Sequence, residues 1–247
     1  MKAIEKPLAI IYLTLFSLLA LLFFVLSTTG CSSDRIEGNQ DLVTQTRPSQ
    51  PFSEVVSEGS FYVKIIPSTE TRIEVKGESN IIAHLSTYSN GTTVTLKFND
   101  GLSILEHYPV EVYLYTPTLH SVRLPGSGTV VCESFSTTTM YLGISGSGSI
   151  IGDFVSEKVE ADISGSGNID LSGEATTGVY TVSGSGNITA NNLHVEYCSA
   201  NVSGSGNMTL YATKTLDVDI SGSGTITYLL NPVVTSKITG SGRLVKF

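Results

Sequence analysis

One tripeptide, Gly-Ser-Gly, recurs seven times in the second half of the 247-residue chain. The copies are 18 to 20 residues apart. They begin at Gly126, Gly146, Gly165, Gly184, Gly204, Gly222 and Gly240. A motif that returns at nearly constant spacing is typical of a stacked repeat, in which each unit is one supersecondary element. The spacing therefore limits the chain to architectures built by stacking similar units.

The residues around each triplet alternate between apolar and polar. The residue two positions before each triplet is always aliphatic: Leu124, Ile144, Ile163, Val182, Val202, Ile220 and Ile238. The residue four positions after its first glycine is also apolar: Val130, Ile150, Ile169, Ile188, Met208, Ile226 and Leu244. A period of two predicts a strand, a glycine turn and a second strand. One such unit cannot bury its apolar face, whereas stacked units can. The pattern predicts an all-β fold, a parallel β-solenoid with coils of about 18–20 residues and regular repeats over 126–247.

Equivalent side chains of successive coils should form columns along the stack. Asn168, Asn187 and Asn207 are expected to form an asparagine ladder, and the triplet serines a serine column. The triplet glycines are expected at tight corners, where either a positive φ or a close backbone approach requires them. They are Gly126, Gly128, Gly146, Gly148, Gly165, Gly167, Gly184, Gly186, Gly204, Gly206, Gly222, Gly224, Gly240 and Gly242.

The two ends of the repeat region carry different signals. Residues 52–125 contain alternating segments without the triplet, and they predict degenerate coils that cap the solenoid at its N-terminal end. Asn90-Gly91 predicts a hairpin turn between two of these segments. At the other end, the segment Arg243–Phe247 is expected to leave an exposed edge. The charges of Arg243 and Lys246 would protect this edge, or it would allow self-association through the solenoid end.

The N-terminus has the pattern of a lipoprotein leader. Lys2 and Lys6 precede an apolar run from Leu8 to Leu26, and small residues then lead to Gly30-Cys31. This order predicts a signal peptide over 1–30 and lipidation of the Cys31 thiol. The alternative is an uncleaved transmembrane anchor, because the apolar run is long enough to span a bilayer. The polar residues 31–51 predict a flexible, lipid-anchored tether to a head domain over 52–247.

Export to the cell envelope follows from either interpretation of the leader. Ser32 after the cysteine favours an outer-membrane lipoprotein. The protein would then be held at the membrane by its lipid, and its periplasmic or surface location stays open.

Composition excludes several other functions. The formal net charge is -8 and charged residues make up 15% of the chain, with no cluster of Lys and Arg. Nucleic-acid binding needs a basic surface and is excluded on this ground. His84, His107, His120 and His194 lack metal-ligand spacing, and no phosphate-binding loop or nucleophile elbow is present. We therefore predict no catalytic, cofactor-binding or metal-binding residue.

Cys132 and Cys198 are expected to be buried free thiols, about three coils apart and too distant for a disulfide.

A polysaccharide-acting β-helix enzyme is a less favoured alternative. Such an enzyme needs clustered carboxylates within a walled groove. Asp162, Asp170, Asp217 and Asp219 are the best candidates, and Asp217 and Asp219 share one face of a strand. Coils of this length leave little chain for the loops that would wall a cleft.

The alternating opening strands, the lipoprotein start and the repeats such as Val182-Ser-Gly-Ser-Gly-Asn-Ile188 resemble the auto-transporter adhesin head GIN domain family. The resemblance covers residues 52–247. It implies a right-handed β-helix, an adhesive role and export from Bacteroidetes-type bacteria, and it brings no established catalytic residues. We expect a non-enzymatic adhesin or binding module that presents its stacked faces to a glycan or a protein. The alternative is a structural or envelope-stress accessory protein of the periplasm.

Overall fold

The computed structural model describes residues 34–105 and 107–247. The chain divides into a small unit, residues 1–35 and 101–103, and a large unit that contains the remainder. The apolar run and Cys31 lie outside the described residues. Among the residues that are described, no helix has both the length and the apolar character needed to cross a membrane. Two short strands, β1 (Asp34–Ile36) and β8 (Leu102–Ile104), form a separate two-stranded sheet.

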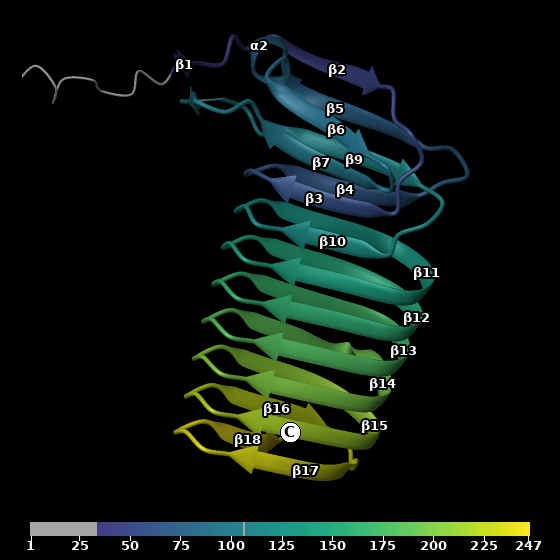
Figure 1. Ribbon diagram of the computed structural model, residues 1–247, viewed down its shortest axis with the longest axis vertical. Coiled ribbons are helices and arrows are strands. Elements are labelled where there is room, and N and C mark those ends of the chain that lie inside the picture. The colour runs from purple at the N-terminus through teal and green to yellow at the C-terminus, as the bar shows by residue number, and fades with distance from the viewer. Residues whose placement is uncertain (1–33, 106) are drawn as a thin grey trace, which may run out of the picture. The chain divides into compact units, whose positions relative to one another are not determined.

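Five long strands form the body of the large unit, and each runs from one Gly-Ser-Gly triplet to the next. They are β11 (Thr129–Ile144), β12 (Ser149–Ile163), β13 (Asn168–Val182), β14 (Asn187–Val202) and β15 (Asn207–Ile220). Neighbours pair in parallel, and equivalent positions of the repeat lie opposite each other, as Ile150 does to Ile169. Figure 1 shows the resulting coils stacked on one another. The prediction of a parallel β-solenoid is confirmed.

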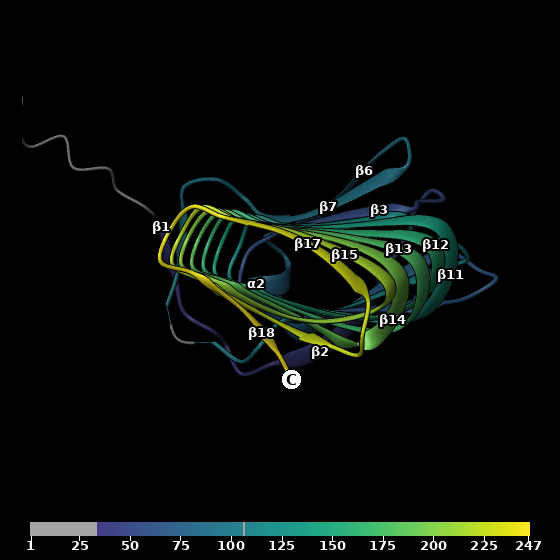
Figure 2. The same ribbon diagram turned by 90° about the horizontal axis from the view of Figure 1, so that it is seen from below.

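Each long strand bends near its middle, so that every coil has two faces (Figure 2). We call the half after a triplet, with Ile150 and Ile169, the post-triplet face. The half before the next triplet, with Ile163 and Val182, is the pre-triplet face. The strand register shifts at the bend, for example between Cys132 and Phe135. The triplet corner therefore closes one side of each coil, and this bend closes the other.

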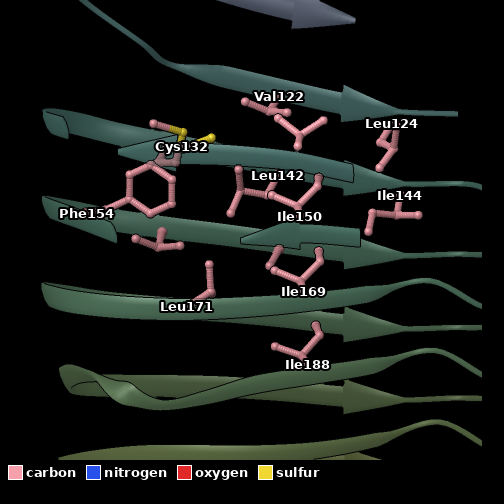
Figure 3. Close-up of a cluster of buried hydrophobic side chains, with 14 of the residues drawn as sticks. Val122, Leu124, Cys132, Leu142, Ile144, Ile150, Phe154, Ile169, Leu171 and Ile188 are labelled. Carbon is pink, nitrogen blue, oxygen red and sulfur yellow. The ribbon is translucent and has the colours of Figure 1, made fainter. Parts of the chain in front are cut away.

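The core lies between the two faces. Side chains such as Leu142, Ile150 and Ile169 point inward and stack on their equivalents in neighbouring coils (Figure 3). Phe154 fills the interior near the bend, where Gly152 leaves space for its ring. Burial of one such side chain contributes about 1.5–3 kcal/mol. The alternating pattern thus becomes a continuous apolar column that holds the coils together.

Four strands of the N-terminal region continue both faces in parallel. They are β3 (Glu54–Glu58) and β10 (Ser121–Leu124) on the pre-triplet face, and β4 (Tyr62–Pro67) and β9 (Glu111–Thr116) on the post-triplet face. Gly59, Ser60 and Phe61 connect β3 to β4 at the position of a triplet. The amide of Gly128 donates to the carbonyl oxygen of Gly59 at 3.0 Å. Residues 52–125 therefore contain coils without the full motif.

The rest of this region also contains antiparallel pairs, which the repeat pattern did not predict. Strand β7 (Thr93–Phe98) lies parallel to β3 and forms a hairpin with β6 (Leu85–Asn90) at Asn90-Gly91, where Gly91 has φ +63°. Strand β5 (Arg72–Glu78) pairs antiparallel with β9. The short helix α2 (Ser79–Ile82) buries Ile81 and Ile82. Together these elements cover the apolar interior at this end.

The predicted flexible tether over 31–51 is wrong for part of its length. Strand β2 (Leu42–Arg47) pairs antiparallel with β5. The Arg47 guanidinium donates to the carbonyl oxygens of Ile82, at 2.6 Å, and Leu85. The carboxylate of the buried Glu78 accepts from the amide of Gln40 at 2.6 Å. Pairing with the edge of β5 and these hydrogen bonds order residues 42–47. Neither interaction requires a hydrophobic period in the sequence, so the absence of such a period did not indicate a flexible segment.

The last coil closes the described stack. It consists of β16 (Thr225–Leu229) and β17 (Val233–Ile238), and β18 (Arg243–Lys246) adds the first strand of a further turn. Strands β16 and β17 both pair with β15, and β18 pairs with β16.

Candidate binding groove on the pre-triplet face

The glycine corners are set by the close approach of neighbouring coils. A Cβ atom on Gly146 would overlap the carbonyl oxygen of Gly126 in the preceding coil, and the same contact recurs at Gly165 and Gly184. Among the described glycines, φ is positive at Gly91, Gly101 and Gly173, none of which belongs to a triplet. The triplet corners therefore require glycine because neighbouring backbones approach closely, and a positive φ is not the reason.

The three asparagines after successive triplets are joined by hydrogen bonds. Nδ2 of Asn187 donates to Oδ1 of Asn168 at 3.0 Å, and Nδ2 of Asn207 donates to Oδ1 of Asn187 at 3.1 Å. The column ends with the amide of Thr225, which donates to Oδ1 of Asn207 at 3.0 Å. In the described part of the chain no hydrogen bond joins the triplet serine hydroxyls, which are exposed. The asparagine hydrogen bonds join neighbouring coils along the stack. This structural role is sufficient to explain why asparagine recurs after the triplets.

A groove of about 510 Å³ runs across several coils on the pre-triplet face. Its lining comes from β3, β10, β11, β12, β13 and the residues that follow β10 to β13. The residues are Val56, Arg123, Leu124, Pro125, Tyr141, Gly143, Ile144, Ser145, Asp162, Ile163, Ser164, Thr181 and Ser183. One side carries Arg123, Tyr141 and Asp162, and the other carries the serines that precede the triplets. The groove combines an apolar floor with a few polar groups, as ligand sites do.

Tyr141 is the one aromatic side chain among the groove's lining residues in the described part of the chain. The hydroxyl end of its ring lies over Gly143, because a Cβ atom there would be 3.0 Å from Oη of Tyr141. The guanidinium carbon of Arg123 lies 5.4 Å from the centre of the ring. Burial, together with the neighbouring Asp162 carboxylate, raises the pKa of the Tyr141 hydroxyl. The phenol stays neutral and can donate a hydrogen bond across the physiological range.

The absence of a side chain at Gly143 creates the hollow. Strand pairing places Gly143 between Arg123 of β10 and Asp162 of β12. A larger residue at this position would fill the space between the guanidinium and the carboxylate. The apolar–polar alternation of the sequence predicted the inward positions of these strands but did not predict the groove. The sequence signal that could have indicated it is the pair Tyr141 and Gly143, an aromatic residue and a glycine on the same outward face.

The candidate carboxylates are not brought together in the groove. Asp162 is the one carboxylate among its lining residues in the described chain. Asp217 and Asp219 lie outward on β15, and Oδ2 of Asp219 is 3.8 Å from Nζ of Lys237. Asp170 is exposed on the post-triplet face. The groove therefore does not bring two of these four carboxylates together.

The histidines and cysteines have local structural contacts. His194 stacks on Tyr211 with ring centres 4.3 Å apart, and Nδ1 of His120 lies 2.7 Å from Oγ1 of Thr137. Within residues 34–105 and 107–247, no group of three or more His, Cys, Asp or Glu side chains is arranged to hold a metal ion. Cys132 and Cys198 are free and buried, as predicted, and burial raises the pKa of each thiol to about 12.

The stacked parallel coils define a repeat protein of the β-solenoid class, with a polar and aromatic groove on one flat face. Residues 51–232 match the family described as "Putative auto-transporter adhesin, head GIN domain". The match covers most of the chain, and the protein belongs to this family. Adhesins are generally exported proteins that are associated with the cell envelope. No curated protein matches the chain.

Solved structures share the fold. A putative adhesin from Bacteroides fragilis is 23% identical, with a TM-score of 0.83 over 86% of this chain and 100% of that one. A putative lipid binding protein from Parabacteroides distasonis is 21% identical, with a TM-score of 0.73 over 87% of this chain and 100% of that one. A putative adhesin from Parabacteroides merdae is 19% identical, with a TM-score of 0.67 over 87% of this chain and 99% of that one. At these identities the likeness shows the fold.

Proposed function

We propose that the protein is a non-enzymatic, adhesin-type binding module of the cell envelope and that the groove at Tyr141 binds a glycan. The observation that carries the proposal is the placement of Arg123, Tyr141 and Asp162 together in one groove of about 510 Å³. An aromatic ring offers an apolar face for a sugar ring, and the guanidinium and carboxylate offer donors and acceptors for its hydroxyls. Membership of an adhesin family supports a binding role.

The direction of the groove supports a ligand with repeating units. It crosses successive coils, which are about 4.8 Å apart in a sheet. Ser145, Ser164 and Ser183 repeat along one side at this spacing, and all three are exposed. A linear glycan would meet the same kind of hydroxyl group at each coil.

A catalytic role is disfavoured by the groove's chemistry. Glycoside hydrolysis generally uses two carboxyl groups that flank the scissile bond. Asp162 has no second carboxylate beside it among the lining residues. We therefore propose binding without turnover.

The leader supports the proposed location. We propose that residues 1–30 are removed, that Cys31 receives the lipid, and that the head is held at the outer membrane. Mass spectrometry of the membrane fraction would test this. A lipid-modified N-terminal cysteine is expected, whereas an intact leader would support the transmembrane anchor. Protease treatment of whole cells distinguishes a surface adhesin, which is digested, from a periplasmic accessory protein, which is protected.

The binding site is tested by a glycan array on the full chain, followed by titration of the best ligand. Tyr141→Ala should weaken binding by at least ten-fold, since stacking of the ring is lost. Ser164→Trp adds a ring at an exposed position and should block the groove. Tyr197→Ala is the matched control, because Tyr197 is exposed and outside the groove. Equal binding by Tyr141→Ala and wild type would rule out this site, and release of sugar products would contradict the non-enzymatic role.

A further inference from the structure

The last coil exposes positions that every preceding coil buries. Ile238 is 42% exposed, whereas its partner Ile220 in the coil above is fully buried at 0%. Val234 is 36% exposed, and its partner Leu216 is 0%. All six residues of β17 are exposed. The interior of the solenoid therefore reaches the surface at this end.

Additional apolar side chains surround this exposed interior. Val233 is 73% exposed and Phe247 is 91% exposed, and Leu230 and Val245 are also exposed. In the described chain, β17 pairs with β15 alone and β18 pairs with β16 alone, so one edge of each strand is unpaired. We call the set Leu230, Val233, Val234, Lys237, Ile238, Arg243, Val245, Lys246 and Phe247 the terminal coil surface. Large exposed apolar side chains gathered at one end of a protein are a feature of interaction surfaces.

The charge of this end is opposite to that of the rest of the chain. Residues 221–247 contain Lys237, Arg243 and Lys246 and no Asp or Glu. Because the whole chain carries -8, residues 1–220 carry -11. Lys237 has an exposed partner in Asp219, at 3.8 Å, and Lys246 donates to the neutral Asn231. The terminal coil surface is thus apolar and basic on an otherwise acidic protein.

A second copy of the chain is a poor occupant of this surface. Apposition of two such ends would bring three cations from each copy together. Lys and Arg on edge strands are a common means of preventing edge-to-edge pairing. A surface that is both apolar and anionic matches the side chains better.

We propose that the terminal coil surface docks onto an anionic phospholipid membrane. Exposed Val and Phe side chains would enter the boundary between headgroups and acyl chains, and the three cations would meet lipid phosphates. The unpaired backbone groups of β17 and β18 would remain hydrogen-bonded to water and headgroups. This surface is separate from the groove at Tyr141, so the inference does not depend on glycan binding.

The test is capture of one population of vesicles by another. The membrane-anchored chain, isolated from the membrane fraction with its own N-terminal anchor, is reconstituted into phosphatidylcholine vesicles, which are then mixed with dye-labelled acceptor vesicles. Acceptors that contain phosphatidylglycerol should be captured, and acceptors of phosphatidylcholine alone should not. Added salt should reduce capture, because the attraction is screened.

Two variants separate the charge from the apolar contribution. Lys237→Gln, Arg243→Gln and Lys246→Gln together should weaken capture by roughly 100-fold, as expected for three cations at an anionic surface. Val233→Ser with Phe247→Ser should also weaken capture. Both variants change exposed residues and should fold normally. The control replaces Lys97, Lys158 and Lys214, three cations outside this coil, by Gln and should leave capture unchanged.

Three results would overturn the proposal. Equal capture of both kinds of acceptor would show that anionic lipid is not recognised. Unchanged capture by the triple glutamine variant would place the contact elsewhere. Cross-linking of Val234→Cys chains into dimers, with no capture of acceptors, would make the second copy the occupant. The triple glutamine variant should bind glycan as wild type does. This measurement therefore distinguishes failure of the membrane-docking proposal from failure of the glycan-binding proposal.

Discussion

A Cβ atom on Gly165 would overlap the carbonyl oxygen of Gly146, its counterpart in the preceding coil. The amide of Ser166 donates to that same oxygen at 3.0 Å. The corner therefore requires glycine because the hydrogen bond that joins two coils draws their backbones together. The triplet repeats along the sequence because this contact repeats along the stack.

Gly165→Ala should destabilise the fold by about 3 kcal/mol, because the added methyl group would force the two coils apart. Urea unfolding followed by circular dichroism measures the change. Ser166→Ala is the control, since this side chain is exposed in the middle of the same triplet and should alter stability by less than about 0.5 kcal/mol. Similar values for the two variants would show that the corner tolerates a Cβ atom.

Asn187→Ala should lower the free energy of unfolding by about 1 kcal/mol. Asn187 is the middle member of the ladder, donating to Asn168 and accepting from both the amide and the side chain of Asn207. Its loss leaves the groups on both sides to be satisfied by water, which is available at this exposed column. Ser149→Ala, in the same column on β12, serves as the comparison in thermal melts. A larger loss for Ser149→Ala than for Asn187→Ala would contradict a stabilising ladder.

Arg47→Ala should release strand β2 from the cap. The guanidinium holds the carbonyl oxygens of Ile82 and Leu85, next to α2, and its partial burial lowers its pKa. Hydrogen–deuterium exchange should show faster uptake across residues 42–47, whereas Thr44→Ala, an exposed position on the same strand, should not. Rapid exchange of these amides in the wild-type chain would instead restore the interpretation of this segment as a tether.

Alkaline pH should weaken the fold through Cys132 and Cys198. Burial raises the pKa of each thiol to about 12, against about 8.5 in an unfolded chain. The folded chain keeps both protons while the unfolded chain releases them, so stability is complete below about pH 8.5 and is lost as pH rises toward 12. The expected slope is about 1.4 kcal/mol per pH unit for each thiol.

Urea titrations at a series of pH values check this slope. Cys132→Ala with Cys198→Ala should start from a lower stability and show a flatter decline. Part of the decline should remain above pH 10, because burial also raises the pKa of Tyr180. An unchanged slope in the double variant would show that the thiols ionise without unfolding the chain.

Features that depend on neighbouring residues in the sequence could be predicted, whereas features that depend on contacts between coils could not. Ile150, Ile163 and Ile169 could be placed inward from alternation alone, because the side chains of a strand point to opposite faces in turn. The hairpin at Asn90-Gly91 was likewise local. The groove was not predictable in this way, because Arg123, Tyr141 and Asp162 come from three different coils and meet only when the register is known.

By itself, the sequence determined the stack. The spacing of Gly-Ser-Gly and the period-two alternation leave parallel coils as the arrangement in which each apolar face is buried by its own equivalent. Only the tertiary structure decided how the stack ends. The edge of β5 recruits the polar segment Leu42–Arg47 through backbone pairing, which carries no hydrophobic signal. Ile238 is exposed while Ile220, in the same repeat position, is buried, because burial depends on whether another coil lies beyond.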